Sequence, residues 1–301
     1  MIGEADVEAF ERDGYWIAPQ IFSAEEIERF RAGLARVEAR EYVKGKPPTL
    51  DLPIPPDPKA LRKIDNAWWA DPDLASLATD ARLGAIASAL LNSPTVRLWQ
   101  DQLLDKPPTG VDTGNIGWHQ DWDSWRTVAS YGGFVTAWVA FDDVDEVNGA
   151  MQVIPGSHHW GHLAGESNFL GTNVEEQLAT LAAERDAKPR HLSMKAGQVS
   201  FHHVLTFHGS GPNLSDRPRR SLAVHLVAGD VTAVDEGEGW RHYNLDLLRG
   251  HGGQLGDAYA LDEWWPVGTR LNAAVPSSSL CPWRCAATRR PSALRAGACA
   301  R

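Results

Sequence analysis

The sequence predicts a mainly β domain with flanking helices, built as a β sandwich or barrel. Short runs rich in β-branched and aromatic residues lie at positions 15–18, 95–104, 136–141, 150–154, 198–201 and 221–227. After residue 94 they are separated by segments rich in Gly, Pro, Asn and Asp, such as KPPTGVDTGNIG and HGSGPNLSDRP. Many short strands divided by such turns are typical of sandwiches and barrels.

Helices are expected mainly in the first ninety residues. The predicted helical segments lie at residues 5–12, 24–42, 72–91 and 165–190, the last of them as a polar insert among the strands. Ser23 and Glu26 have the spacing of a capping box, in which each side chain accepts a hydrogen bond from the other residue's backbone N–H. Residues 45–59 contain six prolines and predict a loop, which is a candidate lid.

Residues 276–301 differ from the rest of the chain. They contain five arginines, no acidic residue and all three cysteines of the protein. We expect a disordered basic tail there. A zinc or redox site on Cys281 and Cys285, or a shifted reading frame, would also explain the composition. No linker divides residues 1–275, so we expect one domain. When the five positive charges of the tail are removed from the net charge of −10, residues 1–275 have a net charge of −15.

Charge and hydropathy exclude several classes of protein. The net charge of −10 and the pI near 5.5 argue against a nucleic-acid binder. No run of 18 apolar residues is present, so no membrane helix is expected. The start, MIGEADVEAFERDG, is acidic and resembles neither a signal peptide nor a transit peptide, which favours the cytoplasm. The composition does not predict an oligomeric state.

Two short segments carry the residues of a candidate metal site. His119 and Asp121 are two positions apart, so in a strand or its extension both side chains point the same way. An imidazole and a carboxylate suit a divalent metal such as iron. His208 would complete a set of two histidines and one carboxylate. Such a set leaves positions open for a chelating cosubstrate and O₂, as in non-heme Fe(II) oxygenases.

An anion anchor is expected next to this site. Arg219 lies eleven residues after His208, at the start of a predicted strand, and Ser221 follows two residues later on the same face. A guanidinium fork pairs well with a carboxylate, and a serine hydroxyl adds a donor. The predicted cosubstrate is therefore a dicarboxylic 2-oxo acid that chelates iron at one end and meets Arg219 and Ser221 at the other.

Three ordered motifs, WHQDWDSW, NGAMQVIPGSHHWG and FHGSGPN…RPRRS, resemble the phytanoyl-CoA dioxygenase superfamily of Fe(II)/2-oxoglutarate oxygenases. The resemblance covers roughly residues 8–228, including the opening FERDGYWIAPQIFSAEEI. It implies a double-stranded β-helix, or jelly roll, of the cupin kind. By the same resemblance, His119, Asp121 and His208 are the iron ligands and Arg219 anchors 2-oxoglutarate. Further cosubstrate-pocket residues implied by the family pattern are Gln100, Lys106, Thr136 and Trp138.

The aromatic residues after the metal motif are candidate substrate contacts. Trp122 and Trp125 follow it directly and are expected at the pocket rim. The run WHQDWDSWR is also similar to ectoine hydroxylases, in which the tryptophan matching Trp125 lines the substrate pocket. Family halogenases lack the metal-binding carboxylate, so Asp121 favours hydroxylation, or a related oxidation such as desaturation.

The activity that the resemblance implies is hydroxylation of an unactivated C–H bond of a small molecule. Fe(II), 2-oxoglutarate and O₂ are the implied cofactors, and succinate and CO₂ are released. A role in specialised biosynthesis is expected by analogy with the family. Two alternatives stay open: a non-redox metal enzyme of the cupin kind, and a catalytically silent binding protein. The tryptophan-rich rim suits a cationic, zwitterionic or flat heterocyclic substrate.

Other histidines are assigned from their place in the pattern. His202 and His203 are expected on a strand near the site, with one of them facing inward. His225 alternates with apolar neighbours and is expected to face the interior. His158 and His159 follow a Pro-Gly-Ser turn, where a capping or packing role is expected.

Overall fold

Two antiparallel β-sheets form the centre of the chain in the computed structural model, which describes residues 2–270 except 54–56, 111–113, 170, 172, 186 and 237–241. The large sheet has the order β1 (Tyr15–Ile17), β9 (Val199–His203), β6 (Phe134–Ala140), β11 (Arg219–Ala228), β4 (Thr95–Lys106), β3 (Arg62–Asp65), β2 (Leu50–Leu52), and β12 (Val267–Arg270) also pairs with β4. The small sheet has the order β5 (Ile116–His119), β10 (His208–Ser210), β7 (Met151–Val153), β8 (Arg190–His191). This is the predicted jelly-roll core, mainly β and open rather than a closed barrel.

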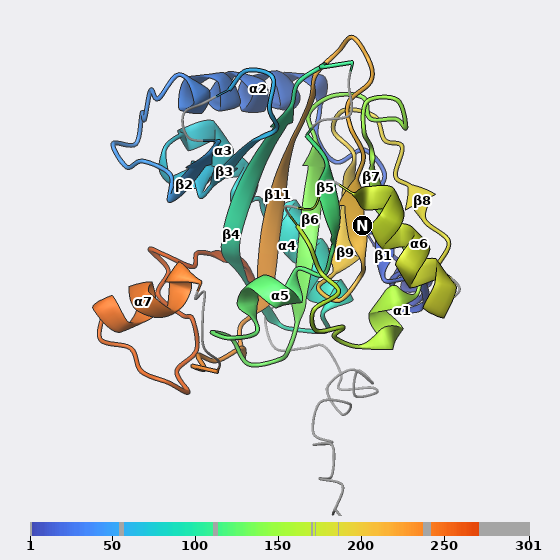
Figure 1. Ribbon diagram of the computed structural model, residues 1–301. Coiled ribbons are helices and arrows are strands. Elements are labelled where there is room, and N and C mark those ends of the chain that lie inside the picture. The colour runs from blue at the N-terminus through green and yellow to red at the C-terminus, as the bar shows by residue number, and fades with distance from the viewer. Residues whose placement is uncertain are drawn as a thin grey trace, which may run out of the picture.

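Helices surround the two sheets (Figure 1). They are α1 (Glu4–Asp13), α2 (Ala24–Glu38), α3 (Pro72–Ala78), α4 (Ala81–Leu90), α5 (Trp122–Trp125), α6 (Val174–Glu184) and α7 (Tyr243–Gly250), with 3₁₀ turns at Ala67–Trp69 and Ser157–Trp160. α4 packs against β4, β6, β11 and β12, and α6 packs against β5 in the small sheet. No helix among the described residues is both long and apolar enough to cross a lipid bilayer.

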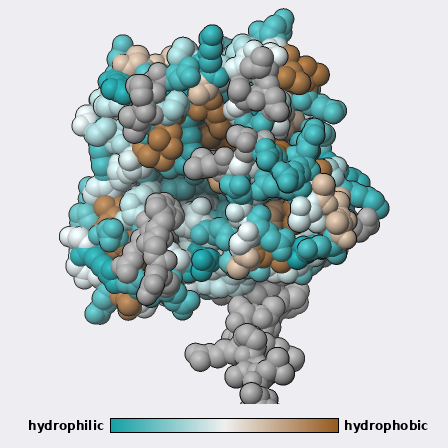
Figure 2. Space-filling model, viewed as in Figure 1, coloured by the Kyte–Doolittle hydropathy of each residue, from teal (hydrophilic) through white to brown (hydrophobic). Residues whose placement is uncertain are grey.

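Alternation along β11 separates the apolar core from the functional interior. Leu222, Val224 and Leu226 are at most 1% exposed and belong to the main hydrophobic cluster with the helices. Residues on the other face of β11, among them Arg219 and His225, point instead into the space between the two sheets. Because successive strand residues face opposite sides, one strand serves both the core and the site. Polar side chains dominate the face shown in Figure 2, and apolar ones form small separate groups there.

All six predicted strands are present, with ends shifted by up to two residues. The predicted helical stretch over residues 72–91 contains two helices, because the chain breaks after Ala78 and Asp80 caps the second helix by accepting from the N–H of Arg82. The capping box of Ser23 and Glu26 is present. The helix that it starts ends at Glu38 instead of Tyr42, and Arg40 takes a positive φ of 61°.

Several elements had not been predicted. The proline-rich loop contains β2, and β3 follows it. The short strands β5, β8, β10 and β12 and the helix α7 were also missed. The expected polar insert contains α6. The tail at residues 276–301, with its predicted disorder and its cysteines, lies outside the described residues, and so does the domain boundary at residue 275.

Candidate metal centre and cosubstrate pocket

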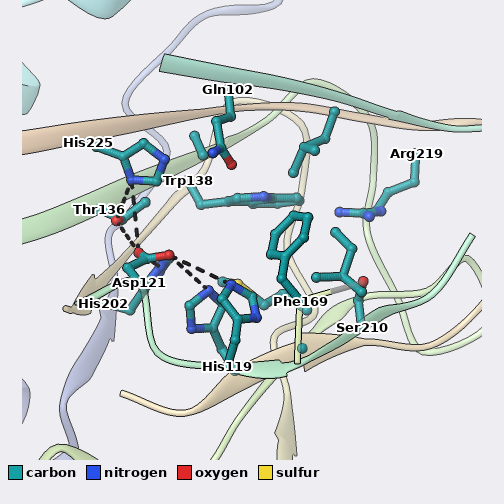
Figure 3. A pocket seen from close by; sticks show the side chains of 16 residues that line it. Gln102, His119, Asp121, Thr136, Trp138, Phe169, His202, Ser210, Arg219 and His225 are labelled. Carbon is teal, nitrogen blue, oxygen red and sulfur yellow. Dashed lines mark hydrogen bonds and ion pairs between the residues drawn. The ribbon is translucent and has the colours of Figure 1, made fainter. Parts of the chain in front are cut away.

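The three candidate metal ligands converge where β5 and β10 pair. His208 lies opposite His119 in the ladder, which brings their ring centroids to 4.1 Å. Asp121 Oδ1 lies 3.7 Å from the Nε2 atoms of both histidines. One ligand atom from each residue lies within 4.8 Å of the other two, and all three side chains are buried. The arrangement is a compact donor set of two nitrogens and one oxygen at the bottom of a pocket (Figure 3).

Asp121 reaches this point by a turn rather than by strand alternation. β5 ends at His119, and Asp121 has helical backbone angles, φ −55° and ψ −30°, at the start of α5. The expectation that strand periodicity aligns the HxD pair was therefore incomplete. The junction between strand and helix turns the carboxylate back toward the imidazoles.

Both imidazoles are oriented by their own backbone. His119 Nδ1 lies 2.8 Å from the carbonyl oxygen of Gly117, and His208 Nδ1 lies 2.9 Å from that of Thr206. A ring whose Nδ1–H donates to a carbonyl presents the lone pair of Nε2 to a metal. Burial, together with His119 and His202, lowers the pKa of His208 well below its usual value, and Asp121 opposes this shift only in part. Neutral imidazoles are the form that coordinates a metal.

The carboxylate of Asp121 is held ionised by its neighbours. Burial opposes its charge, but His208, His119 and His202 more than offset this and keep the pKa of Asp121 well below its usual range. Its outer oxygen, Oδ2, accepts a hydrogen bond of 2.7 Å from Thr136 Oγ1 and lies 3.4 Å from His202 Nε2. Thr136 Oγ1 in turn lies 2.8 Å from His225 Nδ1. Oδ1 is thereby left to face the two ligand imidazoles.

Thr136→Val should weaken metal binding, because it removes the hydroxyl that fixes Asp121 Oδ2. Loss of such an outer partner typically costs about 10- to 100-fold in metal affinity. We expect a loss in this range for Co(II), measured by anaerobic titration against a competing chelator. Thr127→Val is the matched control, since Thr127 is also buried and its hydroxyl has no partner among the described residues. Equal affinities in the two variants would contradict the role given to Thr136.

The pocket between the sheets leads from the metal ligands to Arg219. Arg219 is 1% exposed and lies opposite Lys106 in the β11–β4 ladder. Its Cζ lies 5.3 Å from the ring centroid of Trp138. Burial lowers the pKa of Arg219 to about 10, against the opposing effects of Asp105 and Asp142, so the guanidinium stays charged at neutral pH.

Arg219 and Ser221 have unused hydrogen-bonding capacity. Nε and Nη2 of Arg219 and Oγ of Ser221 are buried and have no hydrogen-bond partner among the described residues. Leaving a buried charged donor unsatisfied is costly, so such atoms call for a partner that the polypeptide does not supply. A carboxylate at the end of the pocket would satisfy Arg219, whereas Ser221, two residues further along β11, is not among the residues that line the pocket. The residues present therefore fit a dicarboxylic 2-oxo acid that reaches from the metal to Arg219.

The other predicted pocket residues divide into two groups. Thr136 and Trp138 line this pocket. Lys106 does not: its Nζ donates to Ser210 Oγ, at 2.8 Å, and to the carbonyl of Gly211, which ties β4 to the strand of His208. Gln100 also lies elsewhere, and its Oε1 accepts a hydrogen bond of 2.7 Å from His242 Nε2.

A second cavity of about 320 Å³ adjoins the metal ligands, and His119 and Asp121 line both spaces. Trp125 lines this cavity, as predicted for a substrate contact. Trp122 lines neither space and packs instead against Tyr131 and Phe134, at 5.3 and 5.8 Å between ring centroids. Trp125 is 2% exposed, so it lies in the buried wall of the cavity and not at the predicted rim, and Trp122 belongs to the core.

The sequence analysis missed several lining residues. Gln102 and Phe169 line both spaces, while the second cavity also has Lys63, Asp65, His242 and Tyr243 in its wall. Gln102 could have been found, because it lies two positions from Gln100 on the same face of β4. Phe169 precedes α6 in the polar insert, and no periodicity marks it. Its ring centroid lies 4.8 Å from that of His119.

Comparison with known proteins agrees with this geometry. The family model "Phytanoyl-CoA dioxygenase (PhyH)" matches residues 10–221. The chain belongs to the phytanoyl-CoA dioxygenase family. An ectoine dioxygenase of Stutzerimonas stutzeri (strain A1501) is 28% identical to it over 230 residues, which are 72% of this chain and 74% of that protein.

One further relative and one solved structure are similar to this family member. A probable alpha-ketoglutarate-dependent hypophosphite dioxygenase of Stutzerimonas stutzeri is 30% identical over 181 residues, 58% of this chain and 59% of the relative. In fold, the epimerase SnoN in complex with Fe³⁺, alpha ketoglutarate and nogalamycin RO aligns with a TM-score of 0.68 at 24% identity, covering 88% of this chain and 98% of that one. This phytanoyl-CoA dioxygenase family protein is an iron- and 2-oxoglutarate-dependent dioxygenase.

Proposed function

We propose that this dioxygenase hydroxylates an unactivated C–H bond of a small molecule in a biosynthetic pathway. The observation that carries the proposal is a buried His119–Asp121–His208 set that shares its walls with two spaces. One space ends at the unsatisfied guanidinium of Arg219, and the other is a cavity of about 320 Å³, the size of a small-molecule site. The cytoplasmic location predicted from the sequence remains a prediction.

His119, Asp121 and His208 would hold the iron, with 2-oxoglutarate reaching toward Arg219. When bound, iron and 2-oxoglutarate supply the oxidising chemistry, in which O₂ is divided between succinate and the substrate. The chain's own part is positioning. Thr136 fixes the outer oxygen of Asp121 by a hydrogen bond, and His202 lies beside that oxygen. Lys106 fixes the strand that carries His208. Trp138 packs beside Arg219 and shields the carboxylate site from water.

Two features favour hydroxylation over related reactions. Asp121 occupies the carboxylate position of the donor set and is held there by hydrogen bonding, so we infer that no coordination position is free for halide. A non-redox metal enzyme would have no use for a buried, unpartnered Arg219. Desaturation would use the same donor set and is separated from hydroxylation by the product.

The proposal is tested by incubating the iron-loaded protein with 2-oxoglutarate, ascorbate, ¹⁸O₂ and pools of small metabolites. We expect one compound to raise succinate release above the substrate-free background and to gain one ¹⁸O atom, seen by mass spectrometry. The His208→Ala variant serves as the inactive control. A product that has lost two hydrogens without gaining oxygen would identify a desaturase instead. Oxygen-independent conversion of a compound, without succinate, would contradict the proposal.

A further inference from the structure

The cavity beside the metal centre contains a pair of opposite charges that the mechanism does not use. Lys63 and Asp65 lie two positions apart on β3, and their side chains line the same wall. Lys63 Nζ lies 2.7 Å from both carboxylate oxygens of Asp65. The side chains are only 14% and 12% exposed, so the pair is largely removed from bulk water.

The other polar groups in this wall are neutral. Burial lowers the pKa of His242 to about 3 and raises that of Tyr243 well above its usual value, so neither is charged at neutral pH. Gln100, Gln102 and Ser124 carry no charge. Apart from the metal ligands, Lys63 and Asp65 are thus the charged side chains among the described residues of this wall, and their charges cancel.

Holding the fold together does not explain the pair. The backbone of β3 is already hydrogen-bonded on both sides, with Lys63 opposite Leu52 of β2 and Leu104 of β4. A buried ion pair contributes little more than apolar residues of the same volume would, because desolvation offsets the attraction. Burial also raises the pKa of Asp65, against the opposing effect of Lys63, so the site disfavours an isolated charge. Costly charges in a cleft beside a catalytic centre are typical of recognition.

We propose that Lys63 and Asp65 recognise the substrate, and that the substrate is a small zwitterion whose ammonium and carboxylate groups lie close together. This inference rests on the proposed function. A ligand carboxylate would lie at Lys63 and its ammonium group at Asp65, so both protein charges and both ligand charges remain paired. A ligand with one charge would leave one charge uncompensated in a poorly solvated site, which is strongly unfavourable.

Two neighbouring features fit the same ligand class. Trp125 and Phe169 place aromatic rings in the cavity, where an ammonium group gains a cation–π attraction. Gln102 lines both spaces and places an amide side chain where a polar ligand would lie. The volume of about 320 Å³ lies at the small end of ligand pockets and accommodates an amino acid rather than an enclosed coenzyme A thioester.

The first test is binding of matched probes to the full-length protein loaded with Ni(II) and 2-oxoglutarate. The probes are the twenty proteinogenic L-amino acids, their N-acetyl derivatives and their methyl esters, measured by calorimetry. We expect at least one free amino acid to bind and each blocked form of it to bind at least ten times more weakly. Absence of binding by every free amino acid, or equal binding of the blocked forms, overturns the inference.

The second test uses variants that do not leave one buried charge alone. Lys63→Met with Asp65→Asn removes both charges, and Lys63→Asp with Asp65→Lys keeps the pair but reverses it. Both should lose at least tenfold in affinity for the amino acid found above. The matched control, Lys195→Met with Asp143→Asn, removes an exposed ion pair of 2.8 Å far from the cavity and should bind unchanged.

Thermal unfolding identifies which of the two variants is folded. If the neutral pair is unstable, the affinity is measured on the variant with the reversed pair. Undiminished affinity in a folded variant overturns the inference. Failure of the proposed function looks different: the wild-type protein would then neither bind 2-oxoglutarate in the presence of metal nor release succinate without substrate. Intact 2-oxoglutarate binding with no amino-acid binding contradicts the inference alone.

Discussion

Replacing His208 with alanine should abolish substrate oxidation and lower Fe(II) affinity by more than the roughly 10- to 100-fold that loss of an outer partner costs. The reason is geometric. His208 and His119 face each other across the β5–β10 ladder, and Asp121 Oδ1 lies 3.7 Å from each ring. Removing one imidazole leaves two donors, which is too few for a stable site of this kind. Titration of Fe(II) under anaerobic conditions measures the loss.

His191→Ala is the matched control for this prediction. His191 lies on β8 of the same small sheet, and its side chain is 33% exposed. It lines neither the pocket that leads to Arg219 nor the second cavity. Iron affinity and turnover should be unchanged in it. Circular dichroism establishes that the His208 variant is folded. A folded His208→Ala protein that binds iron as tightly as the parent would refute the ligand set.

Arg219→Met should weaken 2-oxoglutarate binding by about 100-fold or more, while metal affinity stays within a few-fold of the parent. Losing one partner of a buried, charge-assisted pair costs about 2–5 kcal/mol, and each 1.4 kcal/mol is a factor of about ten. Methionine keeps the bulk beside Trp138 but removes the charge. The measurement is the dissociation constant of 2-oxoglutarate in the presence of metal.

The same variant should have an unusual effect on stability. In the ligand-free protein Arg219 is a buried charge with two nitrogens unpartnered among the described residues, so its removal should leave the free energy of unfolding unchanged or raised. Arg220→Met is the control. Arg220 faces the opposite side of β11 and pairs with Asp142 at 2.7 Å. It should lose stability and keep its affinity for 2-oxoglutarate. The reverse pattern in the two variants would show that Arg219 is structural.

The sequence predicted the strands of the sheet core and the histidines that face the metal site, because both follow local patterns in the chain. β4, β6 and β11 are rich in β-branched and aromatic residues and lie between turn-rich segments, so they were identified. One of the neighbouring pair His202 and His203 was expected to face inward, and His202 does, 3.4 Å from Asp121 Oδ2. His225 faces the interior as predicted and contacts Thr136.

What the sequence could not predict depends on contacts between distant segments. β3 has only four residues and contains both Lys63 and Asp65, so no run of alternating residues marked it as a strand. Its charges are recognisable as a pair only after β3 joins β4 at the edge of the cavity. Phe169 and Tyr243 enter the site from segments without a sheet pattern. Gln100 and Lys106 were predicted to line the cosubstrate pocket. The residue of β4 between them that lines this pocket is Gln102.

The central claim is that His119, Asp121, His208 and Arg219 together bind iron and 2-oxoglutarate. The most direct test is the visible absorption spectrum of the anaerobic Fe(II) protein during titration with 2-oxoglutarate. We predict a new charge-transfer band that saturates at one equivalent per chain, disappears in His208→Ala and needs about 100-fold more 2-oxoglutarate in Arg219→Met. No band in the wild-type protein, or a band unaffected by either substitution, would contradict this account.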